Sequence, residues 1–178
     1  MCASLIVSPT AALRHAARRA MPVTPFHFGP GLLLKAAAPR WVSLTAFAAA
    51  NVAIDVESLV HLATGQHPVH ATLHTFAASL AMGVAAGGIV GGIGRRRRVS
   101  HGEFAARPAL VGGLLGGVSH PLLDGVMHSD IRPFLPWSAE NPLYRLVELG
   151  TLHGACVASA ALGVAVLAWR ASARAARG

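Results

Sequence analysis

Residues 72–94 read TLHTFAASLAMGVAAGGIVGGIG and decide the fold class, because this stretch holds no Asp, Glu, Lys or Arg. The charge-free region is longer still and runs from Ser58 to Gly94. A helix needs about 20 consecutive apolar residues to cross the ~30 Å hydrocarbon core of a bilayer. We therefore predict that residues 72–94 form a transmembrane helix.

Three further apolar segments of similar length lie at 41–62, 108–128 and 149–169. The last carries no formal charge, whereas the other two turn polar part-way along. A shorter segment at 28–38 is apolar except for Lys35 and would give only ~16 Å of helix. We predict an all-α integral membrane bundle of about four transmembrane helices, preceded by a short interfacial or half-inserted helix.

The composition supports this class. Hydrophobic residues make up 53% of the 178 residues and charged residues only 12%, with a mean hydropathy of +0.52. Soluble domains carry about 25% charged residues, so the composition argues against a soluble globule, a disordered chain or a coiled coil. The two cysteines are too few for a disulfide scaffold or a cysteine-rich zinc site.

We expect one domain, residues 21–170, made of transmembrane helices. Residues 1–20 are basic and acid-free. We interpret them as a disordered or non-native extension, with Met21 as the working start, or as a targeting segment. Residues 171–178 are predicted to form a basic tail.

The basic residues predict an orientation. Thirteen fall on one side of the predicted membrane and two on the other. The positive-inside rule places the larger group in the cytoplasm, which predicts a multi-pass inner-membrane protein with both termini cytoplasmic. The larger group comprises Arg14, Arg18, Arg19, Lys35, Arg40, Arg95–Arg98, Arg107, Arg170, Arg174 and Arg177, and the smaller one Arg132 and Arg145.

The run Arg95–Arg98 does not indicate a nucleic-acid site. It lies where a loop between two cytoplasmic helix ends is expected, and it lacks the interleaved aromatic residues common in such sites. The expected partner is the lipid bilayer, with no nucleic acid, and the oligomeric state stays open.

Glycines four residues apart, which let membrane helices approach closely, occur at 83, 87 and 91, at 88 and 92, at 112 and 116, and at 113 and 117.

Histidines and carboxylates gather where three predicted spans reach the non-cytoplasmic face. Ionisable groups are expensive inside a membrane and normally line a functional interior. Imidazole and carboxylate together are ligands for Zn²⁺ and related ions. We predict a divalent metal site, with Zn²⁺ as the first choice, formed by His120, Asp124, Asp55, His74, His70 and His128.

Spacing favours this set. His120, Asp124 and His128 stand at i, i+4 and i+8, on one side of the third span. His70 and His74 are also four apart, and share a face if their turn is helical. Lone histidines elsewhere, such as His67 in the loop, are read as solvated side chains.

Five short motifs carry a family resemblance over about residues 21–165. They are Thr24–His27, Asp55–Glu57, His70 with His74, Ser119–Asp124 and Arg132–Trp137. At these motifs the chain resembles the YdjM-like membrane-bound metal-dependent hydrolases, with Glu57 where that family has a second Asp. The resemblance implies a divalent metal and hydrolysis, and it adds His27 to the site.

The implied role of His27 conflicts with the predicted topology, which places the chain before the first span in the cytoplasm. One way to reconcile them is for residues 27–39 to dip into the bilayer, with His27 deep and Arg40 at the inner surface.

The leading hypothesis is a metal-dependent hydrolase at the non-cytoplasmic membrane face, acting on a lipid or phosphoester substrate. Glu57 would be the general base, and Arg132 would bind an anionic substrate group. The alternatives are a divalent-metal or proton transporter that uses the same cluster, and a non-catalytic protein with a structural metal. Transport is disfavoured because residues 85–93 and 109–117, in the cytoplasmic halves of two spans, are Gly, Ala and aliphatic.

Overall fold

The computed structural model describes residues 25–99 and 101–177, and all regular secondary structure within them is helical, as predicted. The predicted extension, residues 1–20, lies outside the described residues. The last helix continues to Ala175, into the stretch predicted as a tail. The elements are η1 (Pro25–His27), α2 (Phe28–Ala37), α3 (Leu44–Thr64), η2 (Thr72–His74), α4 (Phe76–Arg96), η3 (Gly102–Phe104), α5 (Ala106–Met127) and α6 (Leu149–Ala175).

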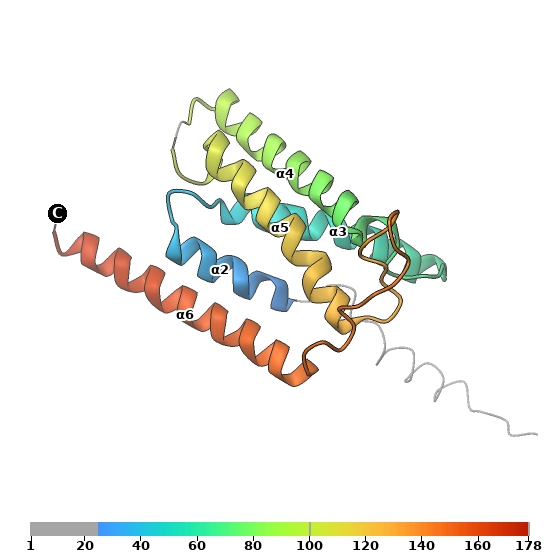
Figure 1. Ribbon diagram of the computed structural model, residues 1–178. Helices are drawn as coiled ribbons and strands as arrows, with labels where there is room; N and C mark the ends of the chain where they lie inside the picture. The colour runs from blue at the N-terminus through green and yellow to red at the C-terminus, as the bar shows by residue number, and fades with distance from the viewer. Residues whose placement is uncertain (1–24, 100, 178) are drawn as a thin grey trace, which may run out of the picture.

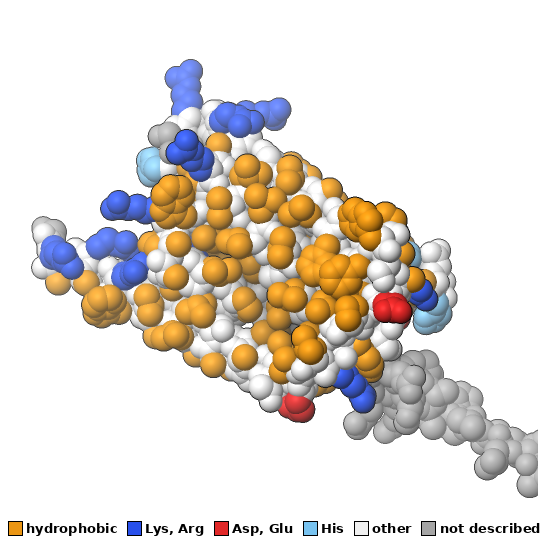
Figure 2. Space-filling model, viewed as in Figure 1, with side chains coloured by type: hydrophobic (Ala, Val, Ile, Leu, Met, Phe, Trp, Pro, Cys, Tyr) orange, Lys and Arg blue, Asp and Glu red, His pale blue; other side chains and the backbone are white. Residues whose placement is uncertain are grey.

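Four of these helices, α3 to α6, are long and apolar enough to cross a membrane. Their outward faces expose large apolar side chains, among them Val56 of α3, Ile89 of α4 and Val157 of α6. Figure 2 shows these apolar side chains as a belt, with most of the basic side chains gathered at one end. We call this the basic end, and the opposite end the site end. A wide exposed apolar belt between two polar ends suits a bilayer.

Uncharged side chains cap the first turns of two spans, α3 and α4. The Ser43 hydroxyl accepts the backbone N–H of Ala46 at the start of α3, and the Thr75 hydroxyl accepts that of Ala78 at the start of α4. Such N-caps satisfy amides that a helix leaves unpaired. At the end of α3, Gly65 adopts the left-handed conformation with φ 69°, which a glycine tolerates best.

Helix α5 lies at the centre of the bundle because glycines on two of its faces admit neighbouring backbones. Gly112 and Gly116 face α3, where a Cβ at Gly116 would lie 2.7 Å from the Phe47 carbonyl oxygen. Gly113 and Gly117 face α4, whose Gly83, Gly87 and Gly91 pack against α5 in return. The four-residue glycine spacing therefore reports close packing here, except at Gly88 and Gly92, which meet no neighbouring helix.

The adjacent glycines 87 and 88 give a matched test of this packing. A Cβ at Gly87 would lie 2.7 Å from the Ala109 carbonyl oxygen and 2.8 Å from the Leu110 Cα, whereas one at Gly88 would meet nothing within 4 Å. Gly87→Ala should lower the free energy of unfolding by ~1–3 kcal/mol, as overpacking does. Gly88→Ala should leave it unchanged or raise it by ~0.5–1 kcal/mol. Thermal unfolding in detergent, followed by circular dichroism, measures both, and equal shifts would contradict the packing.

Helix α2 runs from the site end towards the basic end, the direction that the predicted dip of residues 27–39 into the bilayer requires. It lies beside α6 (Figure 1), where Gly29 packs against Cys156 and Gly163 against Leu32. The Arg170 guanidinium donates to the Ala36 carbonyl at 2.7 Å, which fixes this end of α2 at the basic end. The opposite end of α2 begins at the polar cluster of α5. His27 therefore lies at the site end of the bundle, whereas Ala36 lies at the basic end.

Candidate metal centre

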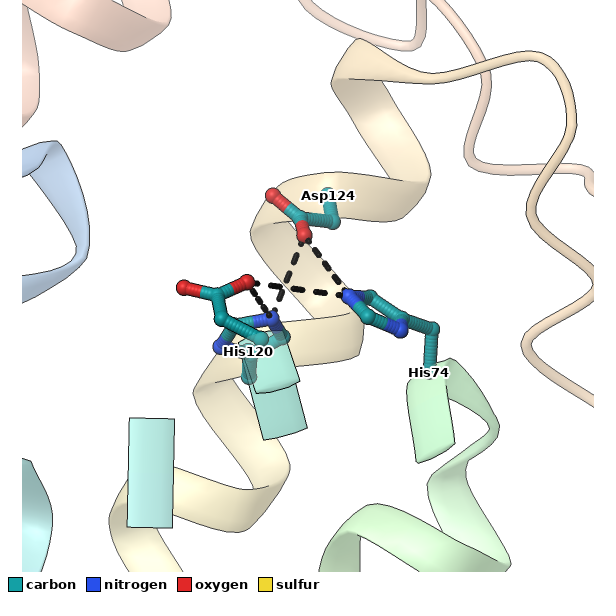
Figure 3. A group of neighbouring side chains, drawn as sticks. His74, His120 and Asp124 are labelled. Carbon is teal, nitrogen blue, oxygen red and sulfur yellow. Dashed lines mark ion pairs between the residues drawn. The ribbon is translucent and has the colours of Figure 1, made fainter. Parts of the chain in front are cut away.

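Four buried side chains from three elements converge at the site end of the bundle (Figure 3). Asp55 comes from α3, His74 from η2, and His120 and Asp124 from adjacent turns of α5. One ligand atom from each lies within 4.8 Å of all the others. We call these four the first ligand group.

The shortest distances in the first ligand group centre on His120. Its Nε2 lies 3.2 Å from Asp124 Oδ2 and 3.3 Å from Asp55 Oδ1. The Nε2 of His74 approaches the same two oxygens, at 3.6 Å and 3.8 Å. Two ring nitrogens and two carboxylate oxygens thus face a shared space.

The His120 ring is held by a buried amide that the sequence analysis did not single out. Its Nδ1 lies 3.0 Å from the Asn51 side-chain oxygen. The Asn51 amide group in turn donates to the Phe47 carbonyl at 2.8 Å, which turns its oxygen towards the ring. Nδ1 of His120 is therefore the donor, and a neutral ring carries its lone pair on Nε2, towards the carboxylates. Fixing the tautomer of a metal-binding histidine in this way is a common outer-sphere device.

Asn51→Leu should weaken Zn²⁺ binding by ~10–100-fold, the range typical of lost outer-sphere partners. Leucine fills a similar volume but leaves the His120 N–H without an acceptor. Asn51→Asp is the matched control, because it keeps an oxygen there and should retain most of the affinity. Competition with a chelator of known affinity measures the change. Equal binding by wild type and Asn51→Leu would show that the amide does not tune the site.

His27 stands against this group, where the family resemblance expected it. Its Nε2 is 2.9 Å from Asp124 Oδ1, and its ring stacks on that of His120 with centroids 4.5 Å apart. The side chain is only 2% exposed. Because α2 begins at the site end and ends near Arg170 at the basic end, its first residues bring His27 to the cluster.

Several buried polar atoms at the centre have no hydrogen-bond partner among the described residues. They are both ring nitrogens of His27, Nδ1 of His74, Nε2 of His120 and Oδ1 of Asp124. An unsatisfied buried polar group costs about 1–3 kcal/mol, so a cluster of them calls for an explanation. Among them, Nε2 of His120 faces the Asp55 and Asp124 carboxylates, and Oδ1 of Asp124 faces Nε2 of His27, close but not aligned as N–H···O bonds. Imidazole with carboxylate is also a donor set that divalent metals accept, so these residues can hold a metal ion.

Glu57 lies beside this group rather than in it. Its carboxylate accepts the backbone N–H groups of Thr72 and Leu73, at 3.1 Å and 2.7 Å. It also lies 3.7 Å from Nδ1 of His74. These contacts hold the η2 turn and orient the His74 ring, with the Ser58 hydroxyl 3.3 Å from Nε2 on the other side.

A second ligand group adjoins the first and shares Asp124 with it. It consists of His70, Asp124 and His128, again with one ligand atom each within 4.8 Å of the others. His128 ends α5 with extended backbone. The His70–His74 turn is not an α-helix, and the two rings meet edge to face at 4.9 Å. The predicted ligands thus come together, but as two groups.

Asp130 orients His70 in the second ligand group. Its carboxylate lies 3.0 Å from Nδ1 of His70 and accepts the His70 backbone N–H at 3.2 Å. Burial alone would raise the pKa of Asp130, but these bonds hold that pKa below its usual value. Burial lowers the pKa of His128, and the neighbouring His70 lowers it further. Both effects favour the neutral imidazole of His128, the form that binds a metal ion.

Arg132 lies at the surface beside this region. It lines a pocket of about 620 Å³ at the site end, together with His70, Thr75, Asp130 and Pro136. In the described part of the chain, its guanidinium makes one long hydrogen bond, 3.5 Å to the Ala139 carbonyl. Most of its donors thus remain available to a ligand in the pocket.

The sequence analysis missed Asn51 and Ser58, although a signal was present. Both lie on the face of α3 that carries Asp55, at i, i+4 and i+7. A polar stripe in an otherwise apolar span indicates an interior contact, even where two of its members carry no charge. His67 is exposed and belongs to neither ligand group, as predicted.

Comparison with known proteins adds no relative to this description. No family model matches the chain, and neither a curated protein nor a solved structure does. What the molecule does must therefore be argued from the buried His/Asp cluster.

Proposed function

We propose that this protein is a membrane-bound metal-dependent hydrolase, with its metal centre near the non-cytoplasmic face. The observation that carries the proposal is the buried convergence of His74, His120, Asp55 and Asp124, in which Nε2 of His120 and Oδ1 of Asp124 lack hydrogen-bond partners among the described residues. Burying these polar and charged side chains costs folding free energy unless a bound ligand such as a metal ion compensates them.

The first ligand group would hold the ion, with His27 as a further ligand through its contact with Asp124. Two imidazoles and two carboxylates suit Zn²⁺, which we propose as the metal. Such an ion polarises a phosphoryl or acyl oxygen and lowers the pKa of a coordinated water. Asn51 and Glu57 act through the two histidines, by fixing the direction in which each ring points. The general-base role predicted for Glu57 stays a prediction.

The surroundings of the site favour a lipid substrate with a phosphoester group. The pocket that His70 and Arg132 line is largely apolar, so it can accept an acyl or glycerol portion. The Arg132 guanidinium is suited to a phosphate, which arginine binds through paired N–H groups. Trp137, 79% exposed in the same loop, belongs to the residue type that prefers the headgroup level.

The distribution of charge supports the orientation. Arg40, Arg95–Arg98, Arg107 and the basic residues late in α6 lie at the basic end, and the positive-inside rule makes that end cytoplasmic. We propose the inner membrane as the location, with the C-terminus in the cytoplasm. The family resemblance at His27, at the residues from Ser119 to Asp124 and in the loop after α5 agrees with this function.

Hydrolysis can be tested directly on lipid phosphoesters in mixed micelles. Zn²⁺-loaded wild-type protein should release the headgroup or phosphate, and a chelator should abolish release until Zn²⁺ is restored. Asp124→Asn should be slower by more than ~100-fold, the upper end for outer-sphere changes, because it removes a ligand. His67→Ala should keep full activity, because this exposed side chain is in neither ligand group. Equal hydrolysis rates in wild type and Asp124→Asn would refute the proposed hydrolase function.

A further inference from the structure

We propose that the centre binds two divalent ions rather than one, the second held by His70, Asp124 and His128. The inference rests on the metal centre proposed above and deepens it. Seven side chains are candidate ligands, yet zinc sites use about four protein ligands. The structure divides six of them into two groups that have only Asp124 in common, and the seventh, His27, contacts Asp124 from outside both groups. A carboxylate shared by two ligand groups is the natural bridge between two ions.

The orientation of His70 and His128 supports a second ion. Asp130 lies against Nδ1 of His70, so that Nε2 of a neutral ring carries the free lone pair. A carboxylate behind a histidine in this way is the outer-sphere arrangement of many metal sites. The His128 ring stacks on that of His70, with centroids 4.1 Å apart. The carbonyl of His128 is held by the Asn141 amide at 3.1 Å, which fixes the chain as it leaves α5.

The two oxygens of Asp124 have different neighbours. Oδ2 lies 3.2 Å from His120 Nε2, whereas Oδ1 lies 2.9 Å from His27 Nε2 and has no hydrogen bond within the described chain. The side chain is 2% exposed, so water does not satisfy it. Oδ1 therefore faces His27, which lies outside both ligand groups, and it is the clustering with His70 and His128 within 4.8 Å that makes Asp124 a candidate bridge.

The second ligand group reaches the proposed substrate pocket through one member. His70 lines the pocket beside Arg132, whereas Asp124 and His128 are not among its lining residues. Three protein ligands leave a coordination position open, as catalytic zinc sites do. Two-ion centres, with ions ~3.5–4 Å apart, are characteristic of phosphoester hydrolysis because they stabilise both the attacking and the leaving oxygen. The proposal therefore favours a phosphoester over an acyl ester substrate.

Metal stoichiometry tests this without reference to activity. Purified protein is stripped with a chelator, reloaded with Zn²⁺, desalted and analysed by mass spectrometry for metal per chain. Wild type should bind two ions, His128→Ala one, and His67→Ala two. A second measurement needs no variant: protein loaded with Mn²⁺ should give an electron paramagnetic resonance spectrum broadened by exchange between two neighbouring ions.

One Zn²⁺ in wild type, two in His128→Ala, or a Mn²⁺ spectrum of isolated ions would overturn the second site. These outcomes are separate from failure of the proposed function. A single ion with intact phosphoester hydrolysis would remove the second site and keep the hydrolase. Two coupled ions in a protein that hydrolyses no lipid phosphoester would keep both sites and remove the hydrolase.

Discussion

His120→Ala is expected to weaken binding of the first Zn²⁺ by more than ~100-fold, beyond the range of outer-sphere changes. His120 is fully buried, and its Nε2 has the shortest nitrogen–oxygen distances of the first ligand group, to Asp55 and Asp124. Removing the ring takes away a ligand and leaves those two carboxylates facing each other. Chelator competition and metal content of the purified protein both measure the loss.

Two controls separate this effect from general damage to the fold. His67→Ala removes an exposed histidine from the loop before η2 and should bind Zn²⁺ as wild type does. His120→Gln keeps a polar side chain near the size of the ring, so it should preserve helix content while still losing the ion. Wild-type Zn²⁺ affinity in a folded His120→Ala protein would refute the first ligand group.

Composition and spacing predicted the fold closely, because a bilayer imposes simple rules on a helix. The ends of the four predicted apolar segments lie within about four residues of the ends of α3 to α6, except at the C-terminal end of α6. Span length and absence of charge leave few alternatives. The glycine spacing also carried real information, because Gly83, Gly87 and Gly91 do face α5. Gly88 and Gly92 show its limit, since the same spacing on the outer face of α4 makes no close helix contact.

The site was predictable as a set of residue types and not as an arrangement. His120 and Asp124 follow from helical spacing, because one helix face fixes both. The position of His27 could not be predicted from charge. The positive-inside rule assigns Lys35 and Arg40 to the basic end, but it contains no information on where α2 begins. The division into two ligand groups depends on the loop and η2 turn that carry His70 and His74, where no periodicity applies.

The alternative of transport makes different demands on the bundle. A permeation path has to continue from the His/Asp cluster to the basic end, through polar groups or water. The packing there is apolar, with Ala46, Val90 and Ala109 forming a buried cluster against Phe104. Backbone contact between Gly87 and Ala109 closes the α4–α5 interface at the same level. The structure therefore favours a site that opens towards one face only.

Thiol accessibility should show this one-sidedness as an all-or-none difference. In a background with Cys2→Ser and Cys156→Ala, Ser129→Cys lies exposed beside the cluster and should react with a membrane-impermeant reagent added to intact cells. Arg174→Cys, exposed near the end of α6, should react only after the cells are opened. Val90→Cys replaces a side chain that is 5% exposed with a smaller one, so it should react from neither side until the protein is denatured.

Sealed vesicles containing the pure protein should take up no more Zn²⁺ than protein-free vesicles, with an ionophore as positive control. Labelling of Val90→Cys in the folded protein, together with Zn²⁺ uptake that Asp124→Asn abolishes, would replace hydrolysis by transport as the function of this cluster.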